Sequence, residues 1–113
     1  MLEGNLKIEI NCEGEDEMSS YFILVKGVIR GFGLKGFIYE KMRMRRLHGF
    51  IEDIDSDEIL VCIENTDHVN INEIVNEIKN EMPYIIISNI DVFPVDSCNP
   101  RYSDIDIIEK DYG

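Results

Sequence analysis

The stretch GVIRGFGLKG, Gly27 to Gly36, decides how this chain of 113 residues folds. It follows an apolar run that is typical of a strand and precedes a run with helical periodicity. Glycines between a strand and a helix let successive backbone N–H groups turn to one side, where the positive end of the helix dipole adds to them. The stretch therefore predicts a concave site for an anion such as phosphate or carboxylate.

The segments on either side of the stretch differ in their hydrophobic period. Residues 21–29 are a nearly continuous run of strand-forming residues, which predicts a buried central strand that bends out of the sheet at Gly27. From Leu34 the apolar residues recur at three- and four-residue steps, which predicts a helix ended by Gly49.

Further along the chain, the pattern predicts a hairpin, a second helix and a last strand. Residues 50–54 and 58–63 are short strand-like runs separated by three turn residues, a spacing that indicates an antiparallel hairpin. Thr66 to Asn70 supplies several possible helix N-caps, and Asn70 with Glu73 resembles a capping box. Residues 84–95 form the last strand, with Pro94 expected at its end or on an edge.

This order, β-α-β-β-α-β, predicts an α+β ferredoxin-like sandwich, in which a four-stranded antiparallel sheet carries two helices on one face. Short alternating runs near both ends, at residues 6–10 and 105–107, predict possible extra edge strands. We divide the chain into an acidic N-terminal extension (1–19), a folded domain (20–96) and an acidic tail (97–113).

Composition limits the classes of function that are open to the chain. Apolar content of 44% with 30% charged residues is typical of a soluble globular protein. No apolar run reaches membrane-spanning length and the N-terminus lacks the features of a signal peptide, so we expect a cytoplasmic protein without a membrane partner. Three cysteines without CxxC spacing predict neither a disulfide framework nor a zinc site, and Cys62 is expected to be a small buried apolar residue.

The net charge of −12 disfavours nucleic acid as a partner, because phosphates repel an acidic protein. The positive charge is concentrated, however: Lys26 to Arg46 contains seven of the 11 lysines and arginines and one acid, Glu40. The basic first helix either binds an acidic protein or an RNA backbone, or is a solvated face whose charges are offset by nearby acids. We favour the solvated face, and no protein partner can be identified.

Two nucleotide-related motifs also overlap the glycine stretch. Gly31, Gly33 and Gly36 spell GxGxxG, with Asp53 about 20 residues further on, as in dinucleotide-binding folds. The immediate hairpin is wrong for that fold, which needs a helix there to reach a parallel strand, so we expect no cofactor. Residues 30–33 with Phe37 partly match an RNA-recognition motif, but that motif belongs on the third strand, where residues 59–63 carry no aromatic residue.

The stretch also resembles the signature of the acylphosphatase family, which runs glycine, arginine, valine, glutamine, glycine, valine, x, phenylalanine, arginine, x, phenylalanine. Gly27, Gly31 and Phe37 match identically, and the triplet 49–51 falls without a gap on the family's glycine, aromatic and valine. The resemblance covers about residues 20–96. It implies a phosphate-binding loop that contains Val28, Ile29, Arg30, Gly31, Phe32, Gly33 and Lys35.

The resemblance also implies that both catalytic positions are substituted. The family's phosphate-binding arginine falls on Lys35, and the asparagine that positions the attacking water falls on Asp53. Lysine lacks the two-pronged grip of arginine, and an ionised aspartate repels a phosphate. The two side chains can instead pair with each other. Arg30 is expected to be a solvated loop cation, although it could replace the missing guanidinium.

We therefore expect an acylphosphatase-like protein that binds a small phosphate or carboxylate anion and lacks efficient hydrolysis. The alternatives are an active acylphosphatase that cleaves carboxyl-phosphate bonds through Lys35 and Asp53, and a binding module that uses the basic helix. No metal is expected at the site.

Overall fold

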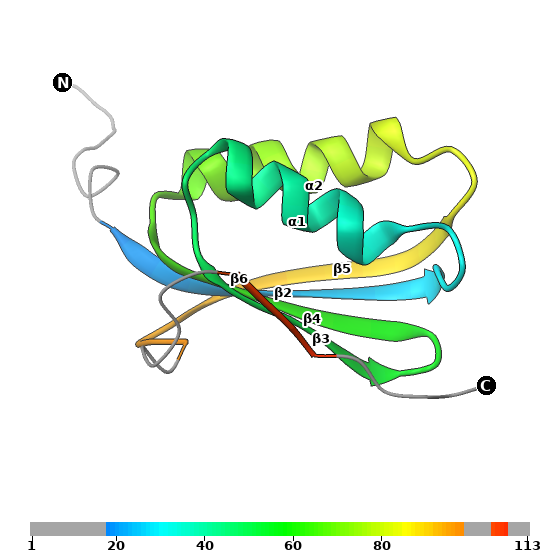
Figure 1. Ribbon diagram of the computed structural model, residues 1–113, viewed down its shortest axis with the longest axis horizontal. Helices are drawn as coiled ribbons and strands as arrows, with labels where there is room; N and C mark the ends of the chain where they lie inside the picture. Colours follow the sequence, from blue (N-terminus) through cyan, green and yellow to red (C-terminus); the bar gives the residue numbers. More distant parts are fainter. Residues whose placement is uncertain (1–17, 99–104, 109–113) are drawn as a thin grey trace, which may run out of the picture.

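Two helices cover one face of a five-stranded sheet in the computed structural model, which describes residues 18–98 and 105–108 (Figure 1). The predicted α+β ferredoxin-like architecture is confirmed. The elements in chain order are β2 (Ser19–Val28), α1 (Leu34–Met44), β3 (Gly49–Asp55), β4 (Glu58–Thr66), α2 (His68–Glu81), β5 (Ile86–Val95) and β6 (Ile105–Ile108).

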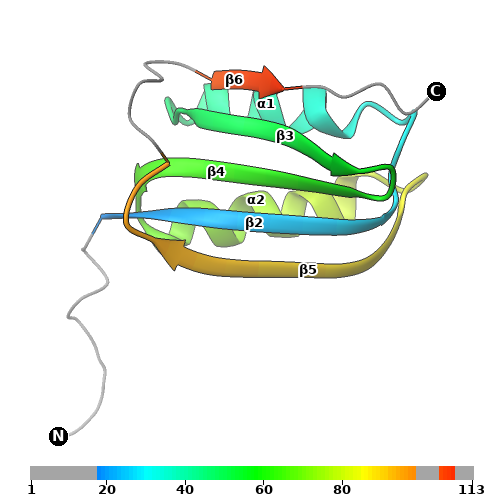
Figure 2. The same cartoon turned by 90° about the horizontal axis from the view of Figure 1, so that it is seen from below.

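The strands lie in the order β5-β2-β4-β3-β6, seen from the uncovered face in Figure 2. The first four pair antiparallel, and β6 adds to the free edge of β3 as a parallel strand, with Gly49 opposite Ile105 and Glu52 opposite Ile108. The predicted extra strand at the C-terminal end is confirmed. The one predicted at residues 6–10 lies outside the described residues.

The core lies between the helices and the sheet, and it is built mainly from isoleucine. Alternate residues of β2, β3 and β4 point toward the helices, as expected for strands with one buried face. Burying one such side chain fully contributes about 1.5–3 kcal/mol, so this layer fixes which face the helices cover. Its fully buried members include Ile23, Val25, Ile51, Val61, Ile63, Ile38, Met42, Ile71, Ile74 and Ile78.

The prediction that Gly49 ends the first helix is wrong, because α1 ends at Met44. Arg46 has a φ of 59° and takes the left-handed position that often falls to glycine after a helix. The Leu47 amide donates to the Met42 carbonyl (2.9 Å) and the Arg46 amide to the Arg43 carbonyl (3.0 Å), the two bonds of a Schellman motif. Gly49 instead opens β3, where a Cβ atom would collide with the Cys62 carbonyl.

The second helix begins earlier than the capping-box pattern indicates. Asp67 is the N-cap of α2, with extended backbone, and its carboxylate accepts a hydrogen bond from the Asn70 amide at 3.0 Å. Asn70 therefore lies inside the first turn. Asp67 was within the range of possible caps, but the capping-box pattern of Asn70 and Glu73 placed the start of the helix three residues too late.

The expectation that the cysteines form no disulfide is also wrong. Cys62 on β4 is bonded to Cys98, which follows β5, with their Cα atoms 5.8 Å apart. Cys62 is fully buried, as predicted, but as half of a disulfide. Spacing could not predict this pair, because the two cysteines are 36 positions apart in the sequence and the folding of the sheet brings them together.

Candidate anion-binding site

The glycine stretch forms the turn between β2 and α1, and two of its glycines have backbone angles that other residues rarely adopt. Gly31 has a φ of 85° and Gly33 a φ of 77°. Gly33 is the N-cap of α1, and its carbonyl accepts the first helical hydrogen bond from the Phe37 amide at 2.9 Å. These angles explain why the turn needs glycine at both positions.

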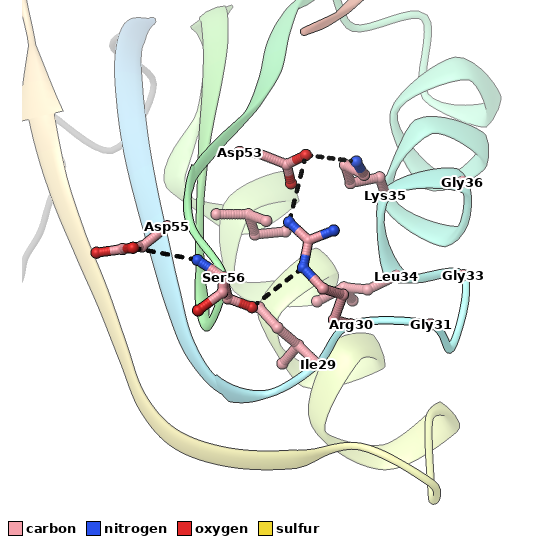
Figure 3. Close-up of a pocket in the computed structure, with 11 residues that line it drawn as sticks. Ile29, Arg30, Gly31, Gly33, Leu34, Lys35, Gly36, Asp53, Asp55 and Ser56 are labelled. Atoms are coloured by element: carbon pink, nitrogen blue, oxygen red, sulfur yellow. Dashed lines mark hydrogen bonds and ion pairs between the residues drawn. The ribbon is translucent and has the colours of Figure 1, made fainter. Parts of the chain in front are cut away.

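This turn is one wall of a pocket of about 300 Å³ at the N-terminal end of α1, and the β3–β4 turn is the opposite wall (Figure 3). A volume of that size accommodates a phosphate group with a small organic substituent. The lining residues are Ile29, Arg30, Gly31, Gly33, Leu34, Lys35, Gly36, Asp53, Asp55, Ser56 and Ile59.

Lys35 and Asp53 form an ion pair inside this pocket. Lys35, in the first turn of α1, places its Nζ 2.8 Å from Oδ2 of Asp53 on β3. The Asp53 side chain is only 3% exposed and that of Lys35 is 22% exposed. Asp53 points to the helix side of the sheet, as does the buried Ile51 two residues before it. A carboxylate buried this deeply needs a cation or hydrogen-bond donors beside it.

Arg30 is not the solvated loop cation that was expected. Its side chain reaches from the glycine turn toward the β3–β4 turn, where Nε donates to the Ser56 carbonyl (3.3 Å) and Nη2 lies 3.7 Å from Asp53 Oδ2. Figure 3 shows Arg30 and Lys35 approaching the same carboxylate from two sides. The site therefore holds two cations around one buried anion.

The structure brings together five of the seven loop residues that the resemblance implied, along with Asp53. Val28 and Phe32 are the exceptions: they do not line the pocket, and they are 59% and 43% exposed. Sequence reasoning missed the contribution of Asp55 and Ser56 to the opposite wall. Asp55 is the last residue of β3 and Ser56 begins the turn to β4. Their place within three residues of Asp53 at this end of the hairpin is the signal that could have predicted them.

Among the described residues that line the pocket, the titratable groups are two cations and, with Asp55 included, two carboxylates. An entering anion would gain the attraction of Lys35 and Arg30 but would meet the repulsion of Asp53. Among the residues that the structure describes, no three His, Cys, Asp or Glu side chains form a group that could hold a metal ion.

Lys41 of α1 and Arg45, the residue that follows the helix, contact acids of α2. Arg45 Nη2 lies 2.7 Å from Glu77 Oε2 and 3.3 Å from Glu73 Oε1, and Lys41 Nζ lies 3.1 Å from Glu81 Oε1. Burial lowers the pKa of Arg45, but hydrogen bonds and charge from Glu77 and Glu73 outweigh that effect and raise the pKa above its ordinary value. Nearby acids therefore offset the charges of Lys41 and Arg45, as the sequence suggested for the basic helix.

Together, the fold and the site define a βαββαβ domain with a glycine-rich turn between its first strand and first helix, which faces Asp53 on the next strand. The chain belongs to the acylphosphatase family, whose model matches residues 21–107. A search of curated proteins gives no match.

Solved structures that resemble the chain share its fold. An acylphosphatase from Bacillus subtilis is 23% identical, with a TM-score of 0.68 over 80% of this chain and 99% of that one. An acylphosphatase from Coxiella burnetii is 15% identical, with a TM-score of 0.68 over 84% and 97%. Full-length HypF in a phosphate- and nucleotide-bound form is 22% identical, with a TM-score of 0.68, over 86% of this chain and 13% of HypF.

No helix in the described part of the chain is long and apolar enough to cross a membrane.

Proposed function

We propose that the protein binds a small phosphate or carboxylate anion between the glycine turn and the β3–β4 turn, and that it hydrolyses acyl phosphates poorly. The observation that carries this proposal is the 2.8 Å ion pair between Lys35 and the buried Asp53. In the free protein the Asp53 carboxylate is paired with Lys35, the cation that would bind the ligand. Asp53 therefore competes with the ligand for Lys35.

The charges around the turn support weak binding of an anion. Two unit charges 4 Å apart interact by about 4 kcal/mol at the effective dielectric constant near a protein surface. The repulsion from Asp53 is of that order, and so is the attraction from each cation. The second carboxylate of the pocket, Asp55, is exposed on the opposite wall, where solvent and salt screen its charge. At the turn itself Lys35 and Arg30 therefore face one close carboxylate, Asp53, and this balance favours an anion.

Catalysis is affected more than binding. A hydrolase of this kind needs a group that holds water in line with the phosphoryl group, and catalytic groups must lie within hydrogen-bond reach of the reacting atoms. Asp53 is engaged with Lys35, and when ionised it offers no hydrogen-bond donor. Lysine holds a phosphate as a point charge without fixing its orientation.

Titration of the protein with inorganic phosphate, followed by backbone amide NMR shifts, tests the binding. We expect shifts confined to the glycine turn and the first turn of α1, residues 29–35, and their loss in Lys35→Ala. A silent turn in the wild-type protein would exclude this site.

Hydrolysis of benzoyl phosphate tests the second part of the proposal. We expect a turnover far below that of the Bacillus subtilis acylphosphatase measured alongside it. A comparable turnover that Lys35→Ala abolishes would support the alternative, an active acylphosphatase in which Lys35 binds phosphate.

We do not favour a binding module based on the basic helix, because Lys41 and Arg45 form ion pairs with α2 and a partner would have to compete with these pairs. A cytoplasmic location also stays a prediction.

A further inference from the structure

An apolar patch lies on the face of the sheet that the helices leave uncovered, the face seen in Figure 2. Successive side chains of a strand point to opposite faces. The residues next to the buried Ile23 and Val61 therefore point away from the helices, and the core of the described residues is formed without them. We define the sheet patch as four side chains of this face, which are half-buried or exposed: Phe22 and Leu24 of β2, Leu60 of β4 and Phe93 of β5.

The register of the strands places the four side chains next to one another. Phe22 lies opposite Phe93, and Leu24 lies opposite Leu60. The rings of Phe22 and Phe93 meet edge to face with their centroids 5.6 Å apart, and Phe93 is 41% exposed. An exposed apolar patch with polar residues at its border is typical of a surface that binds another molecule.

The segment after β5 lies against the same face, at one end of the patch. Its Cys98 is bonded to Cys62, which is in register with Phe22. The two leucines lie two residues further along their strands, toward the β3–β4 turn. A partner therefore reaches the patch from the side of this turn.

Two carboxylates flank the leucines of the sheet patch. Asp91 of β5 lies opposite Leu24, and Glu52 of β3 lies opposite Leu60. Neither acid forms an ion pair within the described part of the chain. The patch therefore combines an apolar centre with a negative charge on each side.

The distance between these acids fits an α-helix. They lie on β5 and β3, three strand spacings apart. Strands are spaced by about 4.8 Å, so about 14 Å separates the two positions. An α-helix with its side chains is about 10–12 Å wide. A helix that runs along the leucines therefore has one flank beside each acid.

We propose that the sheet patch binds a basic amphipathic helix of another protein. The apolar stripe of this helix packs on the patch, and lysines or arginines on its two flanks face Glu52 and Asp91. A surface of this size fits a weak, transient interaction. The patch lies on the opposite side of the sheet from Asp53 and the pocket, so the proposal does not depend on the proposed anion binding.

Charge separates this partner from other occupants of the face. A second copy of the chain would set the same acids against each other, and each copy has a net charge of −12. The N-terminal extension of the chain is acidic as well, and a nucleic acid brings phosphates. The row nearer the β3–β4 turn is neutral in sum, because Lys26 lies opposite Glu58. A cationic partner is therefore the one that the patch attracts.

Titration of the full chain with a designed peptide, followed by backbone amide NMR shifts, tests the proposal. The peptide is a helix of about 15 residues with leucines on one stripe and lysines on both flanks. We expect shifts at β2 and β4 around Leu24 and Leu60, none along the helices, and weaker binding as salt screens the flanking charges. A peptide with serine in place of each leucine should bind about tenfold more weakly.

A matched pair of double variants tests the role of the two acids. Glu52→Gln with Asp91→Asn removes both flanking charges and should weaken binding of the leucine–lysine peptide about fivefold. Glu40→Gln with Glu81→Gln is the control, because it removes two exposed acids from the helices. It should change the Kd by less than about twofold. Circular dichroism checks that both double variants are folded.

Four results would overturn the proposal. They are peptide-induced shifts on the helices instead of the sheet face, equal weakening of binding in the two double variants, and equally tight binding of a peptide with glutamate in place of each lysine. The fourth is a concentration-dependent shift of the sheet-face amides without peptide, which would assign the face to a second copy of the chain.

Discussion

At the scale of single residues, the proposed site centres on Lys35 and Asp53, which the resemblance places where the family signature has an arginine and an asparagine. The family's pair carries one positive charge, whereas Lys35 and Asp53 together are neutral. The new carboxylate is buried and the new cation lies 2.8 Å from it, so each substitution makes the other tolerable. We therefore propose that this ion pair lowers the affinity of the site for an external anion.

Removing the cation of this pair should destabilise the protein. In Lys35→Ala the Asp53 carboxylate stays buried and loses its 2.8 Å partner while Arg30 remains 3.7 Å away, so we expect a loss of about 2 kcal/mol, somewhat below the usual cost of breaking a buried pair. Urea denaturation measures the change. The double variant Lys35→Ala, Asp53→Asn is the control and should recover part of the loss. No recovery would mean that the ion pair is not the cause.

The glycine turn offers a matched test of backbone conformation. Gly31 has a φ of 85° and Gly36 lies inside α1, and an added Cβ would meet nothing within 4 Å at either position. Gly31→Ala should therefore destabilise the protein by about 1–2 kcal/mol through the left-handed backbone alone. Gly36→Ala should stabilise it by about 0.5–1 kcal/mol. Thermal unfolding of both variants measures this, and equal effects would contradict the turn geometry.

At the scale of the elements, the helix ends were harder to predict than the helices. A glycine pattern placed the end of α1 at Gly49, whereas Arg46 adopts the left-handed angle and the Schellman motif closes the helix earlier. Between Met44 and Leu47 the sequence has no glycine or asparagine that would indicate the end of the helix. For α2, Asp67 and Asn70 are both good N-caps, and only the backbone shows which of them accepts a bond from the other.

The role of Asp67 as N-cap can be tested by substituting its side chain. Asp67→Ala removes the acceptor of the Asn70 amide and should cost about 1 kcal/mol of stability, whereas Asp67→Ser should retain most of it. Asn72→Ala, on the exposed side of the same helix, serves as the control and should change stability by less than about 0.5 kcal/mol. Chemical denaturation of the three variants distinguishes these outcomes. An unaffected Asp67→Ala protein would mean that the cap is not used in solution.

At the scale of the whole molecule, the element order and the layer arrangement were predictable because hydrophobic periodicity and turn residues report them directly. The meeting of Lys35 and Asp53 was also predictable, through the family resemblance. The reach of Arg30 across the pocket and the Cys62–Cys98 bond were not. Both interactions join residues far apart in the sequence. The order of the strands in the sheet determines which residues meet, and no local sequence pattern contains that information.

The most direct test of the account compares phosphate binding to the wild-type protein and to Asp53→Asn by NMR titration. Replacing the carboxylate with an amide removes the charge that competes with phosphate for Lys35, so we predict about tenfold tighter binding, equivalent to about 1.4 kcal/mol, at the same turn amides. The Asp55→Asn variant removes an exposed carboxylate from the rim and controls for net charge, with a much smaller gain. Equal or weaker phosphate binding by Asp53→Asn would contradict the claim that the Lys35–Asp53 pair holds the anion site in its free state.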